Sequence, residues 1–188
     1  SKKKIDKNRL NFLALITLVG FSLLGYLFHY LFLDSHFYEV IWKGEEILVQ
    51  LGIGIGHGAI GGMLALVIIN LPFLKETKVW FERLMKPFKL KIQDIIFISF
   101  CAGVGEEVFF RGALQELIGI WPTAILFVAI HGYLNPKNWK ISIYGGFMVL
   151  FTAGLGYLTS HFGLISAMTA HALIDFILLY TVIDRGKK

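Results

Sequence analysis

Long apolar runs separated by short charged linkers constrain the fold of this chain more than any other feature of its sequence. An α-helix needs roughly 20 apolar residues to cross the hydrocarbon core of a bilayer, which is about 30 Å thick. The sequence predicts about six such spans, at residues 10–33, 47–74, 94–118, 121–134, 141–159 and 162–183. We therefore expect an all-α, polytopic membrane helix bundle, in which residues 1–188 form one integral membrane domain.

The composition agrees with a membrane protein and disfavours a soluble or nucleic-acid-binding one. Only 16% of the residues are charged, and the mean hydropathy is +0.67, whereas soluble domains carry about 25% charged residues. The formal charge of +5 does not indicate nucleic-acid binding, because the basic residues cluster in the linkers. The single cysteine, Cys101, excludes an internal disulfide.

The charges of the linkers predict an orientation. Basic residues gather at 2–9, 75–91, 137–140 and 185–188, whereas the linker at 34–46 is mainly acidic. Basic linkers alternate with acidic or neutral ones, so both termini are expected in the cytoplasm, most simply across a bacterial cytoplasmic membrane. Aromatic residues interleaved with lysines at 79–90 predict an amphipathic helix in the membrane interface.

Glycines in the second span have two interpretations. Residues 56–61 match the GxGxxG pattern of dinucleotide-binding folds, but no predicted strand precedes them and they lie inside a membrane helix. Gly54, Gly58 and Gly62 are spaced by four, which puts them on one helix face. Close helix packing through this small-residue face is the favoured interpretation, and His57 is expected to be a hydrogen-bonded packing residue.

Six ionisable residues lie inside the predicted spans: Glu106, Glu107, Arg111, His131, His171 and Asp175. A charge inside a membrane helix costs roughly 2.5–3.5 kcal/mol on insertion scales, so such residues usually face a cavity or one another. At about 1.5 Å rise per residue, Glu106, His131 and His171 reach the middle of the membrane within about one helix turn of the same depth. The sequence therefore predicts an active-site cavity at mid-membrane.

Spacing within each helix suggests how these residues divide their roles. Glu107 and Arg111 are four apart, share a face and can form an ion pair. Glu106 points about 100° away and is left free to act as a general base. His171 and Asp175 are also four apart and share a face.

Other features near these residues carry weaker signals. Phe127 lies one turn before His131 and could brace its ring, although an ordinary core or lipid-facing aromatic fits the spacing equally well. The chain has no HExxH zinc motif. Cys101 lies about 140° around the helix from Glu106, which disfavours a cysteine-based site.

The chain contains an EExxxR motif at 106–111, an FxxxH motif at 127–131 and an HxxxD motif at 171–175. These three motifs, in this order and each in a predicted span, resemble the CPBP family of membrane proteases. That family includes type II CAAX prenyl endopeptidases and bacterial bacteriocin-processing or Abi-type proteins. The resemblance covers a catalytic core at 94–183, whereas the first two spans match only in hydrophobicity.

The resemblance implies a role for each motif residue. Glu106 and His131 would activate a water, His171 and Asp175 would stabilise the oxyanion, and the supporting residues would be Glu107, Arg111 and Phe127. The prenyl endopeptidases carry asparagine where this chain has Asp175. An amide can donate a hydrogen bond whereas an ionised carboxylate cannot, so Asp175 is either protonated or orients His171. The family has also been described as metal-dependent, and Glu106, His131, His171 and Asp175 could hold a divalent metal such as zinc.

The predicted function is therefore an intramembrane endopeptidase. Its expected partners are membrane lipids and a membrane-associated peptide substrate, either prenylated or leader-bearing, with no nucleic acid. Two alternatives remain at this point: a non-proteolytic family member that acts as an immunity or regulatory scaffold, and a small proton-coupled transporter. The absence of an inverted repeat in the sequence counts against the transporter.

Overall fold

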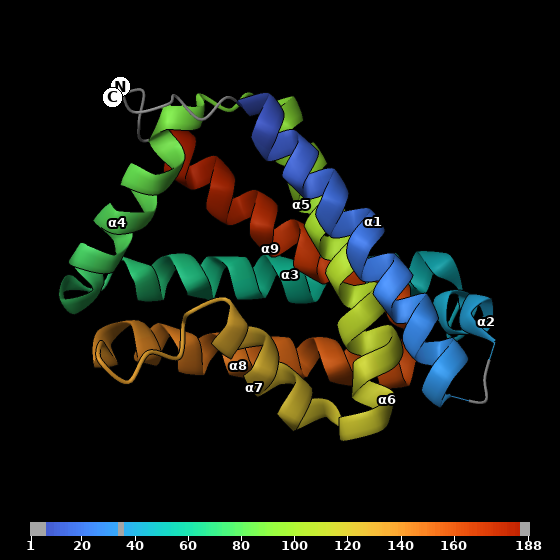
Figure 1. The fold of residues 1–188 in the computed structure, drawn as a ribbon. Helices are drawn as coiled ribbons and strands as arrows, with labels where there is room; N and C mark the ends of the chain where they lie inside the picture. Colours follow the sequence, from blue (N-terminus) through green and yellow to red (C-terminus); the bar gives the residue numbers. More distant parts are fainter. Residues whose placement is uncertain (1–6, 34–35, 185–188) are drawn as a thin grey trace.

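The computed structural model describes residues 7–33 and 36–184, which form a bundle of helices (Figure 1). The α-helices are α1 (Lys7–Phe32), α2 (Phe37–Trp42), α3 (Ile47–Ile69), α4 (Lys75–Met85), α5 (Ile92–Phe109), α6 (Gln115–Ile118), α7 (Ile120–Ile130), α8 (Trp139–Phe162) and α9 (Leu164–Asp184). Short 3₁₀ turns occupy Pro72–Leu74 and Lys86–Phe88, and a π-helical turn, Phe110–Leu114, joins α5 to α6. Within the described ranges no strand occurs, and the predicted all-α membrane bundle is confirmed. The charged residues Lys2, Lys3, Lys4, Asp6, Asp34, Arg185, Lys187 and Lys188 lie outside the described residues.

Four of the helices, α1, α3, α8 and α9, are long and apolar enough to cross a membrane. The remaining two predicted spans are less regular than the sequence suggests. The 94–118 segment is divided into α5, the π turn and α6, and α5 carries three carboxylates in 18 residues. Helix α7 has only 11 residues, a length of about 16 Å that covers roughly half of the hydrocarbon core. These two segments carry Glu106, Glu107, Arg111 and His131, whereas His171 and Asp175 lie in the regular helix α9.

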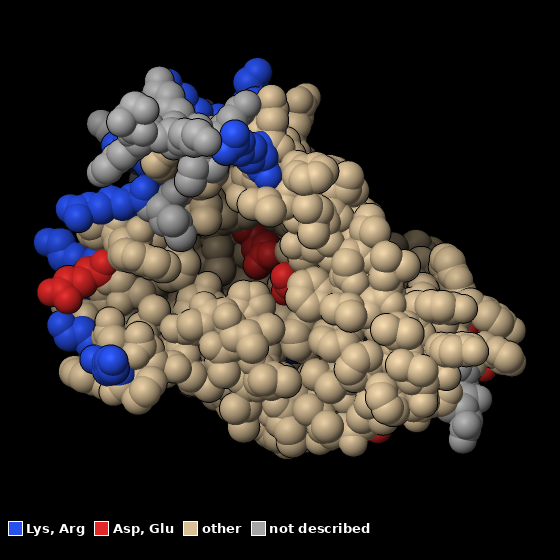
Figure 2. Space-filling model, viewed as in Figure 1, with Lys and Arg blue, Asp and Glu red and all other residues tan. Residues whose placement is uncertain are grey.

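The linkers gather at two ends of the bundle, as helices of alternating direction require. At one end, Glu76 of α4 forms an ion pair with Lys140 of α8, with 3.6 Å between Nζ and Oε2. At the other, Gly44 and Gly163 pair in an isolated β-bridge between the α2–α3 linker and the α8–α9 turn. Figure 2 shows that lysine and arginine side chains gather at the end that holds α4. The grouping agrees with the predicted order of the spans, and the assignment of that end to the cytoplasm stays a prediction.

Helix α3 packs closely against α9 through its glycine face. A Cβ atom at Gly58 would lie 2.6 Å from the carbonyl oxygen of Ala170. At Gly54 it would lie 2.5 Å from that of Ser166, and at Gly62 2.7 Å from the Ile177 side chain. The predicted small-residue packing face is therefore confirmed, and it brings α9 directly against α3.

A buried apolar core between α3, α8 and α9 supports the region where the site lies. Its members include Leu155 of α8 and Ile174 of α9, both fully or almost fully buried. His57 of α3 stacks on Phe151 of α8 with 4.8 Å between ring centroids, and its Nε2 lies 3.3 Å from the Phe151 carbonyl oxygen. The expectation that His57 is a hydrogen-bonded packing residue is confirmed.

Candidate functional site

Helices α5 and α9 and the end of α7 bring the four predicted catalytic residues together. The Oε2 atom of Glu106 lies 3.6 Å from His131 Nε2 and 3.9 Å from His171 Nε2. His171 Nε2 lies 3.6 Å from Asp175 Oδ2. Three elements that are distant in the sequence thus converge on one carboxylate oxygen, as the depth argument predicts. The catalytic roles of these residues remain predictions.

Glu107 contacts this cluster through His171 and is itself paired with Arg111. Its Oε1 atom accepts hydrogen bonds from Arg111 Nη1 at 2.8 Å and from His171 Nδ1 at 2.7 Å, and the side chain is fully buried. The predicted Glu107–Arg111 pair is confirmed, whereas the bond to His171 was not predicted. A carboxylate beside a buried arginine accepts, so Nδ1 carries the hydrogen and Nε2 is left facing Glu106 and Asp175. Glu107 therefore orients this ring, because the Asp175 carboxylate is too distant for a hydrogen bond.

Arg111 and Gln115 both attach the segment after α5 to α8 through hydrogen bonds to its backbone. The Arg111 guanidinium donates through Nη2 to the carbonyl oxygen of Thr152 at 3.0 Å and lies 4.8 Å from the centre of the Phe127 ring. Four residues later, Gln115 Nε2 donates to the carbonyl oxygen of Gly156 at 3.1 Å. Both side chains are buried. Buried polar groups need hydrogen-bond partners, and the carbonyl oxygens of α8 supply them here.

The π turn follows directly after the two glutamates. Phe110–Leu114 is π-helical, where the sequence predicts one continuous α-helix over 94–118. A ring nitrogen of His29 in α1 donates to the carbonyl oxygen of Gly112 at 2.5 Å, which satisfies an acceptor within the turn. Wider π turns are frequently found at functional sites. Here the turn lies where Arg111 leaves α5 to reach both Glu107 and α8.

His131 is held by Phe127, as the spacing suggested. Its Nδ1 donates to the carbonyl oxygen of Phe127 at 2.7 Å, and the two ring centroids are 4.4 Å apart. Since a carbonyl only accepts, Nδ1 carries the hydrogen and Nε2 faces Glu106. Helix α7 ends one residue before His131, and Gly132 leaves the helix with φ of +78°. The predicted span at 121–134 is therefore too long, and His131 lies at the end of the helix rather than within it.

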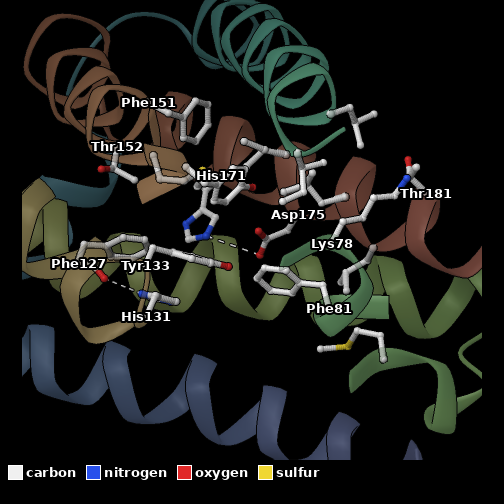
Figure 3. Close-up of a pocket in the computed structure, with 18 of the residues that line it drawn as sticks. Lys78, Phe81, Phe127, His131, Tyr133, Phe151, Thr152, His171, Asp175 and Thr181 are labelled. Carbon is white, nitrogen blue, oxygen red and sulfur yellow. Dashed lines mark hydrogen bonds and ion pairs between the residues drawn. The ribbon is translucent and has the colours of Figure 1, made fainter. Parts of the chain in front are cut away.

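An apolar cavity of about 270 Å³ leads away from the cluster (Figure 3). Glu106, His131, His171 and Asp175 line one part of it. The walls are mainly apolar and include Leu66, Ile69, Phe81, Met85, Phe151 and Ile174. The part formed by α4 carries Lys78, whose Nζ donates to Asn70 Oδ1 at 2.6 Å. Figure 2 shows acidic side chains inside a hollow whose rim is formed mainly by residues other than Lys, Arg, Asp and Glu.

Several lining residues were not predicted from the sequence. Tyr133, Tyr144 and Thr152 line the cavity with α4, although none of them belongs to the three motifs. Tyr133 lies two residues after His131, and this short spacing is the one signal that could have pointed to it. The α4 residues carried no such signal, because their position depends on how the α3–α4 turn folds back over α9.

The unsatisfied oxygen of Glu106 is the site's clearest chemical feature. Its Oε2 is buried and accepts no hydrogen bond from another described residue, although two ring nitrogens lie within 4 Å. Among the described residues, no group of three or more His, Cys, Asp and Glu side chains could hold a metal ion. The metal site predicted at Glu106, His131, His171 and Asp175 is therefore not supported by this geometry and stays a prediction.

Comparison with known proteins identifies relatives of the region that carries the site. A sequence model described as type II CAAX prenyl endopeptidase Rce1-like matches residues 88–177, which contain all three motifs. The uncharacterised protein YpbD of Bacillus subtilis (strain 168) is 37% identical over 87 residues. This stretch is 46% of the present chain and 44% of the relative, so the chain matches less than half of YpbD. No solved structure matches the chain significantly.

Proposed function

We propose that this chain hydrolyses a peptide bond with a water activated by Glu106. The match of residues 88–177 to the Rce1-like, CAAX-protease-like family of membrane endopeptidases supports this proposal. The observation that carries the proposal concerns Glu106, which lines the apolar cavity. Its Oε2 atom is buried and accepts no hydrogen bond from a described residue. It lies 3.6 Å from His131 Nε2 and 3.9 Å from His171 Nε2. These gaps are longer than hydrogen bonds, and a water that lies to one side of the carboxylate and either ring nitrogen, within hydrogen-bond distance of both, would bridge them.

In the proposed reaction, Glu106 is the general base and later the general acid. It takes a proton from the water as the water oxygen bonds to the carbonyl carbon of the substrate. The electron pair of the C=O double bond moves to the carbonyl oxygen. When this tetrahedral intermediate collapses, the C–N bond breaks and Glu106 returns the proton to the leaving nitrogen. The products are a new carboxyl group and a new amine, and the second water proton stays with the new carboxyl.

The two histidines complement Glu106 through their Nε2 atoms. His131 has its hydrogen on Nδ1, so its Nε2 can accept from the attacking water and orient it. His171 is anchored through Nδ1 by Glu107, and in its doubly protonated form it would donate from Nε2 to the oxygen that becomes negative. The Glu107–Arg111 pair supports this arrangement without facing the substrate.

The cavity suggests a substrate with an apolar group next to the scissile bond. Its volume of about 270 Å³ is close to the lower end of small-ligand pockets, about 300–1,000 Å³. Its walls are mainly apolar, and it reaches α4, the helix whose aromatic and basic residues suit a membrane interface. A membrane-associated peptide with an apolar side chain or an attached isoprenoid fits this description, and a leader-bearing peptide is the second substrate class to test.

Cleavage assays on the purified protein in detergent test the proposal. A quenched fluorescent peptide library should include one prenylated CAAX peptide and its unprenylated counterpart. Glu106→Gln should lower the cleavage rate about 10²- to 10⁴-fold, because it removes the general base. The matched control is Glu116→Gln, which changes an exposed carboxylate on α6 and should leave the rate unchanged. Equal rates for the wild type and Glu106→Gln, or no cleavage by either, would contradict the proposal.

A further inference from the structure

A peptide hydrolase must stabilise the carbonyl oxygen that becomes negative, and Asp175 supplies no donor in its ionised form. The other polar side chains that line the cavity are mostly engaged. Thr152 Oγ1 donates to the Val149 carbonyl oxygen at 3.2 Å, and Thr181 Oγ1 donates to that of Ile177 at 2.8 Å. The amine of Lys78 donates to Asn70. Arg111 is buried, does not line the cavity and donates to Glu107 and Thr152.

Two phenol hydroxyls remain available in the cavity. Tyr133 and Tyr144 both line it, and neither hydroxyl is hydrogen-bonded to another residue in the described part of the chain. Tyr144 is 3% exposed, whereas Tyr133 is more exposed and follows the predicted catalytic His131 by two residues. Tyr133 is therefore the better placed of the two to meet a substrate.

The ring of Tyr133 is held firmly beside the site. It lies nearly parallel to the His131 ring, with 6° between planes and 6.3 Å between centroids. It also makes an edge contact with Tyr144, at 5.5 Å between centroids, and a tilted contact with Phe81 of α4, at 5.9 Å. Gly145 makes room for this segment, because a Cβ atom there would collide with the carbonyl oxygen of Tyr133. Contacts from three elements thus fix the direction of the hydroxyl.

Figure 3 shows the Tyr133 ring between His131 and Asp175, with its hydroxyl at the end nearer Asp175. We propose that Tyr133 is a further catalytic residue, whose hydroxyl donates a hydrogen bond to the carbonyl oxygen of the scissile peptide bond as that oxygen becomes negative. The inference rests on the proposed hydrolase function. Tyr133 keeps its proton throughout: it stabilises the tetrahedral intermediate while Glu106 carries the transferred proton. It supplies the neutral donor that an ionised Asp175 does not.

Tyr133→Phe tests this role, because it removes the hydroxyl and keeps the ring contacts. Losing one oxyanion donor should lower kcat about 10²- to 10³-fold and leave KM and the thermal midpoint near the wild-type values. Tyr157→Phe is the matched control, since Tyr157 is 45% exposed and does not line the cavity. Adding Asp175→Asn to Tyr133→Phe should raise kcat again by about tenfold or more, because the amide can donate.

Parallel measurement of the wild type and Glu106→Gln separates the two proposals. If the wild type cleaves, Glu106→Gln does not, and Tyr133→Phe cleaves at the wild-type rate, the role of Tyr133 is wrong while the hydrolase function stands. A rise in KM at unchanged kcat would also overturn the inference, because the hydroxyl would then bind the substrate before the transition state. A loss of kcat in Tyr144→Phe but not in Tyr133→Phe would assign the donor to Tyr144. A wild type without any cleavage would overturn both proposals.

Discussion

The adjacent glutamates of α5 should respond differently to the same substitution. Glu107 is 0% exposed and accepts from Arg111 at 2.8 Å and from His171 at 2.7 Å. Glu107→Gln would leave the buried Arg111 charge without its partner, which typically costs about 3–5 kcal/mol of unfolding free energy. The Glu106 side chain is 12% exposed, and its Oε2 accepts no hydrogen bond from a described residue. Glu106→Gln therefore breaks no such bond at Oε2 and should cost less than about 1 kcal/mol.

Thermal unfolding in one detergent, measured beside cleavage, tests this division of roles. For soluble domains of about 150–250 residues, 1 kcal/mol shifts Tm by roughly 2–4 °C. By this scale Glu107→Gln should lower Tm by roughly 6–20 °C, and its activity should fall because His171 Nδ1 then donates to a neutral amide oxygen, a weaker acceptor than the carboxylate. Glu106→Gln should stay within about 4 °C of the wild type and lose cleavage. Equal Tm losses with equal residual activity would refute the reasoning, and Glu116→Gln controls for the handling of the variants.

Four further predictions concern the site and the fold. Asp175→Asn should keep substantial activity and extend it toward higher pH, because an amide donates without ionising; collapse of activity together with loss of bound metal would contradict this. If Glu106 activates the water without a metal, cleavage should persist after chelation, with metal content checked by mass spectrometry; recovery only on adding zinc would show otherwise. Gly58→Leu should cost about 1–3 kcal/mol in thermal unfolding, or more, because even a Cβ atom would lie 2.6 Å from the Ala170 carbonyl oxygen. Reporter fusions at Lys86 and Glu45 should report opposite sides of the membrane, with Lys86 cytoplasmic.

Local spacing predicted the contacts that lie within one helix. The Glu107–Arg111 pair, the Phe127–His131 contact and the glycine face of α3 follow from residues three or four apart. Helix length and rise also indicated that Glu106 and the two histidines reach one depth. These inferences needed no knowledge of how the helices rotate about their axes.

Contacts between side chains of different helices could not be predicted from spacing. The bond from His171 to Glu107 joins residues 64 apart in sequence, and it depends on how α9 is rotated against α5. The π turn depends equally on tertiary context, because His29 of α1 satisfies the Gly112 carbonyl oxygen. The cavity required the position of α4, and the role proposed for Tyr133 required the packing of its ring. The sequence therefore indicated which residues meet but not which partner orients each one.

A single turnover in water enriched in ¹⁸O measures the proposed chemistry most directly, because an oxygen from the Glu106 carboxylate itself would enter the product unlabelled. If Glu106 activates a water for attack on the carbonyl carbon, mass spectrometry of the products should find one ¹⁸O atom in the new carboxyl group. The label should appear at the same rate with the wild type and with Glu116→Gln, and about 10²- to 10⁴-fold more slowly with Glu106→Gln. Labelled product formed at equal rates by the wild type and Glu106→Gln, or cleavage that leaves the new carboxyl group unlabelled, would contradict a water activated by Glu106.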